Sequence, residues 1–216
     1  MNRLFVAFCL LASVALASCG EDRGRGQVVG SLIIPDCEDG EALRFTCPAN
    51  VKLEDCEAFD LDADFFALET LDEIAVLRMQ KGGRTFAQTD GLLVQIRDVR
   101  LLRGNLGASL PVGPDANIRA ALGLFELCPD TTQNFELSGE IVFEKFGIGR
   151  GDKVSGTITF LEVREGVGCS DDREETGPRC SRDRRADAHG QVLGRLKGTF
   201  DFTVRRGPPH QQFTGN

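Results

Sequence analysis

The chain has 216 residues, a formal net charge of −8, eight cysteines, fifteen phenylalanines, and neither tryptophan nor tyrosine. A negative chain gains nothing from counterion release on a polyanion, so the charge argues against nucleic-acid binding. Tryptophan and tyrosine rings usually line sugar-binding surfaces and anchor tight protein interfaces, so their absence argues against carbohydrate binding.

The first segment, residues 1–18, has the pattern of a removable signal peptide. Arg3 precedes an apolar run that ends at Leu16, and small residues then lead to Cys19. The apolar run is shorter than the about 20 residues that span a bilayer. A charged head and a short apolar middle are typical of a secretory signal. One alternative is an ordinary secretory signal cut near Ala17, with Cys19 as a spare thiol.

The four residues Leu16-Ala17-Ser18-Cys19 resemble the lipobox of bacterial lipoprotein signal peptides at every position. This resemblance implies that the thiol of Cys19 carries diacylglycerol and that cleavage before Cys19 frees an amine that can be acylated. It implies a lipid-anchored protein of the cell envelope, and Gly20 in place of aspartate favours the outer membrane in that family. More than one acyl chain gives stable anchoring, because each buried methylene contributes about 0.8 kcal/mol.

The rest of the chain divides into a tether, one domain and a tail. Residues 19–27 are polar and glycine-rich after the cysteine, which predicts a lipidated flexible tether. The remaining length suits one sizeable hydrophobic core, so we expect a single β domain over residues 28–207. Residues 208–216 begin with two prolines and are expected to form a C-terminal tail.

Four segments share one pattern, in which an apolar residue is followed by glycine two positions later and then by two more apolar residues at alternate positions. Period-two alternation predicts strands with one buried face. In the last segment Leu196, Phe200 and Phe202 face one way, and charged or polar residues face the other. Glycine on the apolar face predicts a bend or room for a neighbouring ring. The segments are residues 28–34, 137–143, 154–160 and 196–202.

Further strands and few helices are expected between these segments. Residues 69–80 also fit a helix by their apolar spacing, but we favour a turn followed by a strand. Many short strands with little helix predict an all-β fold, an antiparallel sandwich-like or barrel-like single domain stapled by disulfides. The additional strands are expected at residues 59–66, 74–80, 92–99, 118–127 and 161–163.

The cysteines predict disulfides. With Cys9 in the removable signal peptide and Cys19 lipidated, six of the eight cysteines remain, and an even number in an oxidising compartment implies up to three bonds among about 15 possible connectivities. Cys169 and Cys180 lie in the most polar stretch, residues 165–190, and are expected to pair with each other. The other two bonds are expected, with no pairing favoured, among Cys37, Cys47, Cys56 and Cys128.

One constellation resembles a metal site. Asp60, Asp62 and Asp64 alternate as at the start of a calcium loop, but an EF-hand needs glycine at its sixth position and glutamate at its twelfth. Phe65 and Leu71 occupy those positions. The three carboxylates are therefore expected to form the solvated face of a strand, and we predict no metal and no cofactor.

Catalytic residues are not evident in the sequence. His189 and His210 are the two histidines, and each lies in a segment rich in glycine, proline or charge. A serine triad needs a supported histidine, and no Gly-x-Ser-x-Gly elbow occurs. We therefore expect no catalytic residues and a protein that is not an enzyme.

The expected function is that of a lipid-anchored, non-enzymatic binding or structural module of the envelope. Its membrane contact is the lipid on Cys19, and its partner is an envelope protein or a surface polymer. The basic residues 182–185 fit a solvated loop, or a contact for the phosphates of such a polymer. The alternatives are a secreted hydrolase and a carrier that holds an apolar ligand inside a phenylalanine-rich barrel.

Overall fold

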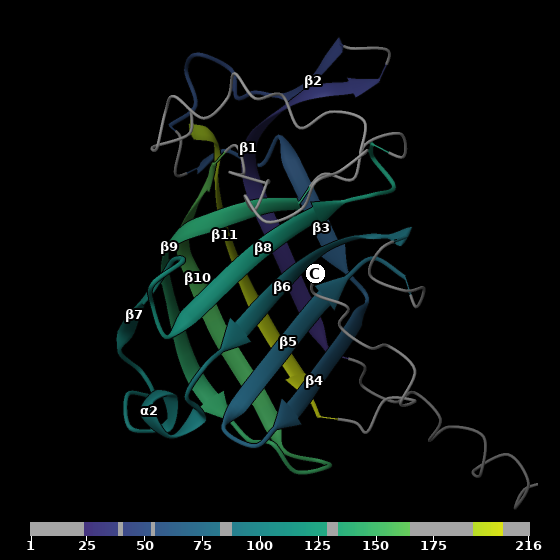
Figure 1. Ribbon diagram of the computed structural model, residues 1–216. Helices are drawn as coiled ribbons and strands as arrows, with labels where there is room; N and C mark the ends of the chain where they lie inside the picture. The colour runs from purple at the N-terminus through teal and green to yellow at the C-terminus, as the bar shows by residue number, and fades with distance from the viewer. Residues whose placement is uncertain are drawn as a thin grey trace, which may run out of the picture.

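Figure 1 shows a computed structural model of the chain, in which regular structure is almost entirely β. Within the described residues no helix has the length and the apolar character needed to cross a bilayer. The structure describes residues 24–38, 41–52, 55–82, 88–128, 134–164 and 192–204. Eleven strands and one short helix follow one another in these residues. They are β1 (Arg25–Glu38), β2 (Glu41–Phe45), β3 (Phe59–Ala63), β4 (Phe65–Leu71), β5 (Ile74–Gln80), β6 (Asp90–Ile96), α2 (Val99–Arg103), β7 (Ser109–Val112), β8 (Ile118–Leu124), β9 (Asn134–Phe146), β10 (Lys153–Arg164) and β11 (Val192–Thr203).

All of these strands belong to one sheet. The order is β2-β1-β11-β10-β9-β7-β8-β6-β5-β4, with β3 beside β1 and an additional pairing of β8 with β9. Neighbouring strands are antiparallel except for the single parallel pair Val112 and Ile118, which joins β7 to β8. The predicted all-β antiparallel domain is confirmed, and of its two forms the barrel-like one is observed.

The sheet curls into a half-barrel whose two ends are bridged by residues 59–71. The first part of this stretch, β3, pairs with β1, and the second part, β4, pairs with β5. Asp64 alone separates the two parts, and its N–H donates to the carbonyl of Gln80. Figure 1 shows the result, with β5 and β6 in front of β1 and β11.

Glycine makes this curl possible, because the four glycine-containing segments form the adjacent strands β1, β11, β10 and β9. A Cβ on Gly30 would collide with the carbonyl oxygen of Arg195 on β11. A Cβ on Gly198 would likewise collide with the carbonyl oxygen of Gln27 on β1. The backbones of neighbouring strands therefore approach at points that no other residue permits, which is how glycine introduces bends into curved sheets.

The predicted room for a ring is confirmed at Gly156. A Cβ on this residue would meet ring atoms of Phe200 as well as the carbonyl oxygen of Val142. Phe200 in turn lies edge-on to Phe143, with ring centroids 5.4 Å apart. Glycine at position 156 thus lets one of the largest core side chains pack directly against the backbone of β10.

The core occupies the concave side of the sheet and is one continuous cluster. On β11 the predicted register is confirmed, because Leu196, Phe200 and Phe202 are at most 2% exposed while Asp201 is exposed. Phe66 of β4 stacks on Phe202 with centroids 5.3 Å apart, so a ring from the last strand of the sheet order packs against β11, which is third from the other end. Such ring pairs contribute about 0.5–1.5 kcal/mol beyond their burial.

The predicted buried face of residues 154–160 is correct up to Ile158 and wrong at Phe160. The pattern of residues 154–160 places Phe160 in the core, but it is 39% exposed. The register of β10 against β9 and β11 shifts between Ile158 and Leu161. An extra residue in a strand turns the following side chains to the other face. Leu161 therefore fills the core position, and Phe160 lies on the outer wall.

Several predicted boundaries also need correction. β1 begins at Arg25, so residues 25–27, expected in the tether, are paired with β11. The strand expected over residues 92–99 ends at Ile96, because Asp98 caps α2 by accepting hydrogen bonds from the N–H groups of Arg100 and Leu101 at 2.8 and 3.0 Å. Residues 69–80 form no helix, as expected, but the turn is confined to residues 72–73, because residues 69–71 are the end of β4 and residues 74–80 form β5.

Candidate functional site

Five residues singled out in the sequence lie outside the described residues. They are Cys19, Cys169, Cys180, His189 and His210. The lipid anchor, the Cys169–Cys180 bond and the unsupported histidines therefore stay predictions. The same holds for the basic residues 182–185.

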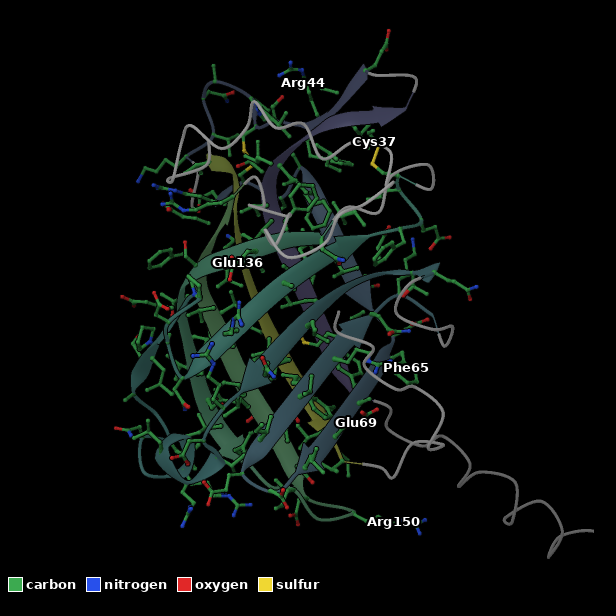
Figure 2. All side chains as sticks on the ribbon, in the orientation of Figure 1. Cys37, Arg44, Phe65, Glu69, Glu136 and Arg150 are labelled. Carbon is green, nitrogen blue, oxygen red and sulfur yellow. A yellow bond between two sulfur atoms is a disulfide. The ribbon has the colours of Figure 1, made fainter. Side chains whose placement is uncertain are left out.

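The other four cysteines form two disulfides, which confirms that they pair among themselves. Cys37 bonds to Cys128 with Cα atoms 5.1 Å apart, and Cys47 bonds to Cys56 with Cα atoms 5.6 Å apart. The first bond ties the end of β1 to the turn after β8. The second closes the loop between β2 and β3. Figure 2 shows Cys37 near β2, at the end of the sheet opposite α2.

Asp90 is a buried carboxylate beside the first disulfide. It begins β6 and is 5% exposed. One of its oxygens accepts hydrogen bonds from the N–H groups of Glu126 and Leu127, at 2.9 and 3.2 Å. These two residues belong to the turn that carries Cys128. Asp90 therefore fixes the turn from which the longer-range disulfide is made.

The charge of Asp90 is disfavoured in the folded protein. Burial raises the pKa of its carboxyl, and the two hydrogen bonds from the turn offset part of that rise. The neighbouring Glu126 carboxylate raises the pKa further, while Lys81 lowers it. With both backbone donors aimed at it, this carboxylate acts as a structural clamp.

We expect Asp90→Ala to lower the free energy of unfolding by about 1–3 kcal/mol, because two part-buried hydrogen bonds from backbone N–H groups would lose their acceptor. Asp90→Asn keeps an acceptor oxygen and removes the charge. Since the folded-state pKa is raised, the wild type carries no charge penalty below the unfolded pKa. It should lose stability relative to Asp90→Asn as pH rises through the unfolded pKa, with the loss complete above the folded pKa.

Urea unfolding of the three proteins from about pH 3 to about pH 7 measures both effects, because this range spans the ordinary aspartate pKa. A difference between wild type and Asp90→Asn that does not change with pH would show that the carboxyl is not desolvated. Equal stability of Asp90→Ala and Asp90→Asn would show that the two hydrogen bonds contribute nothing.

Two of the three aspartates, Asp60 and Asp62, form a solvated face of β3, as predicted, while Asp64 is exposed but follows the strand. Asp60 and Asp62 are exposed, while Phe59 and Leu61 on the opposite face are buried. The amide of Gln27 donates to Asp60 at 3.1 Å, across the pair of strands β1 and β3. Among the residues that the structure describes, no group of three histidine, cysteine or acidic side chains is placed to hold a metal ion.

A shallow groove of about 480 Å³ lies beside this row, where β1 begins. Its lining consists of residues 24–27, residues 62–64 and Thr199. The polar residues of this lining are Arg25, Gln27, Asp62, Asp64 and Thr199, so the open surface crosses β1, β3 and β11. The groove marks the point where the tether enters the fold, and it offers no enclosed space for a substrate.

Charged side chains on the outer wall join neighbouring strands. Glu162 of β10 accepts from Arg164 at 2.8 Å and from Arg195 of β11 at 3.0 Å. Arg164 also donates to the hydroxyl of Ser138 on β9 at 3.3 Å. Exposed pairs of this kind contribute at most about 1 kcal/mol each. These interactions link β9, β10 and β11, and the charged groups pair with one another.

Arg78 is a buried charge that sequence reasoning missed. It lies on β5 with 1% exposure, and its guanidinium is 3.6 Å from the Glu69 carboxylate on β4. Burial lowers the pKa of Arg78, and Glu69 raises it in part. Alternation along residues 74–80 assigns Arg78 to the outer face, where arginine is ordinary, so the sequence gives no sign of its burial.

Comparison of the chain with protein-family models, with curated proteins and with solved structures gives no match.

Proposed function

We propose that this protein is a lipid-anchored envelope protein that serves as a non-enzymatic binding or structural module. The observation that carries the proposal is the complete lipobox at residues 16–19, which stands five residues before the described fold begins at Gly24. Two disulfides within the following domain support an oxidising compartment, since such bonds persist in secreted and periplasmic proteins.

The use of the polar groups supports a module over a hydrolase. Asp90 holds the turn before Cys128, Asp98 caps α2, and Glu162 joins β10 to β11. A general acid or base must point at the proton that it transfers, on a supported scaffold. These three carboxylates point instead at backbone or at arginines of the same sheet, so they contribute to stability.

The packing of the interior supports a module over a carrier of apolar ligands. A carrier needs a cavity that its ligand fills. In this sheet Phe143 contacts both Phe146 and Phe200, with centroids 5.6 and 5.4 Å away. Glycine at position 156 brings the wall close to one of these rings. The rings thus pack against one another and against the wall.

We expect Cys19→Ser to abolish lipidation and leave an unprocessed or mislocalised precursor. Intact mass and partition into a detergent phase measure the outcome. Ser18→Ala is the matched control, because it keeps a small residue before the cysteine and should mature normally. Normal maturation of Cys19→Ser, with unchanged membrane partition, would contradict the anchor.

The partner side of the proposal is tested by crosslinking in native envelopes followed by mass spectrometry. A binding or structural module should yield a reproducible envelope protein or surface polymer, and fewer crosslinks when Cys19→Ser removes the anchor. A hydrolase should instead show a turnover that disappears in His189→Ala, and a carrier should copurify with lipid in its interior. Either of these results would replace the module.

A further inference from the structure

One end of the sheet gathers the point where the chain enters the fold and several of its turns. The start of β1 pairs with the end of β11. In the turn between β9 and β10, the N–H of Gly151 donates to the carbonyl of Val204, just past β11. The N–H of Val99 in α2 donates to the carbonyl of Glu73, in the turn between β4 and β5. Figure 1 shows α2 and both turns at this end, called below the entry end.

The entry end carries most of the exposed large apolar side chains. Eight such residues are exposed in the described part of the chain, and five of them lie on α2 and its following turn or on the two strand turns. We call these five the apolar rim. Leu71 is 73% exposed and Leu101 is 53% exposed, although α2 has its own buried face. The apolar rim consists of Leu71, Ile74, Leu101, Leu106 and Ile148.

Gathered apolar side chains at one end of a molecule indicate contact with an apolar phase or partner. The length of the tether between Cys19 and the fold favours the apolar phase of the membrane over an apolar partner. Cys19 and Gly24 are five residues apart, and five residues span at most about 18 Å even when fully extended. A lipid on Cys19 would therefore hold the entry end within that distance of the membrane, with the apolar rim on the same end.

We propose that the apolar rim rests in the headgroup region of the same bilayer that takes up the lipid of Cys19. This inference rests on the proposed anchor. Apolar side chains of interfacial segments enter about 5–10 Å into the boundary between headgroups and acyl chains. The domain is thereby held upright, with the disulfide end, marked by Cys37 in Figure 2, directed away from the membrane.

Charge around the rim is compatible with this contact and does not drive it. Arg103 and Arg150 are exposed at this end and can donate to lipid phosphates in the bidentate way that arginine favours. Asp72 is exposed beside Leu71, and Glu73 forms an ion pair with Arg100. The surface thus mixes both signs, and the contact depends on the leucine and isoleucine side chains.

The absence of tryptophan and tyrosine makes a direct test possible, because one introduced tryptophan is the only such fluorophore in the chain. We place it at the rim in Leu71→Trp and in Leu101→Trp. Phe160→Trp is the matched control, since Phe160 is exposed on the outer wall seven residues beyond the start of β10, about 23 Å along the strand. Each full-length lipidated variant is reconstituted into vesicles of phosphatidylethanolamine and phosphatidylglycerol with brominated acyl chains.

We expect Leu71→Trp and Leu101→Trp to show blue-shifted emission and loss of fluorescence on the brominated vesicles, while Phe160→Trp shows neither. Flotation of the vesicles separates the two hypotheses. If the protein floats and the rim tryptophans are quenched no more than the control, the docking of the rim is wrong and the anchor stands. If the protein does not float and Cys19 carries no lipid, the anchor is wrong, and the docking that depends on it is wrong too.

Discussion

Phe200→Ala should lower the free energy of unfolding by about 3–5 kcal/mol, the usual cost of removing a buried phenylalanine. The ring is 2% exposed, contacts Phe143, and occupies the space that Gly156 leaves open. Because Gly156 has no side chain that could move into the vacated volume, the cavity should collapse poorly. The loss is a large share of the about 5–15 kcal/mol that stabilises a typical domain.

The adjacent Asp201→Ala is the matched control. Asp201 points to the outer face, where its carboxylate is 3.6 Å from the ammonium group of Lys153 and is largely exposed. Such a pair contributes at most about 1 kcal/mol. Chemical and thermal unfolding of both variants gives the comparison. If Phe200→Ala and Asp201→Ala were tolerated equally, the register of β11 and the packing of the core around it would be wrong.

The features of the fold that can be predicted from the sequence are the strands in which apolar and polar residues alternate. Along β11, Thr199, Asp201 and Thr203 flank Phe200 and Phe202, so a single strand register buries the rings and directs these polar side chains outward. The recurring glycines also identify β1, β9, β10 and β11 in the sequence. Each of these glycines stands at an inward position of the alternation, where an apolar side chain would otherwise be expected. Alternation and recurring glycines can be read within a short segment, so they predict strands even when the neighbouring strands in the sheet are unknown.

The misplaced features depend on single residues or on distant parts of the chain. A bulge adds one residue to a strand without changing its composition, so nothing in residues 154–160 warns that Phe160 turns outward. Helix α2 has five residues, too few for a periodic pattern, and the capping side chain of Asp98 is its clearest sign. Both features lie below the length at which periodicity carries information.

The residues of the candidate site depend most strongly on three-dimensional contacts. An even number of cysteines predicts bonds but not their connectivity, and Cys37 meets Cys128 across 91 positions of sequence. The Asp90-Gly91 pair is a turn signal by composition, yet both residues lie in β6, and Asp90 accepts hydrogen bonds from a turn 36 residues away. No local pattern records such an acceptor.

The two described disulfides should differ in their contribution to stability. A disulfide restricts the unfolded chain, and the restriction grows with the length of the loop that it closes. Cys37 and Cys128 are 91 positions apart, while Cys47 and Cys56 are 9 positions apart. Loop entropy predicts a loss of about 4–5 kcal/mol when the first bond is removed and about 2–3 kcal/mol when the second is removed.

Replacing both cysteines of a pair by alanine avoids a free thiol and a buried hydroxyl, so Cys37→Ala/Cys128→Ala is compared with Cys47→Ala/Cys56→Ala as its short-loop control. Urea unfolding under non-reducing conditions gives both losses. The long bond also holds the turn that Asp90 binds, so its removal should weaken that clamp and widen the gap between the two variants. Equal losses in the two variants would mean that restriction of the unfolded chain does not set the stability of this sheet.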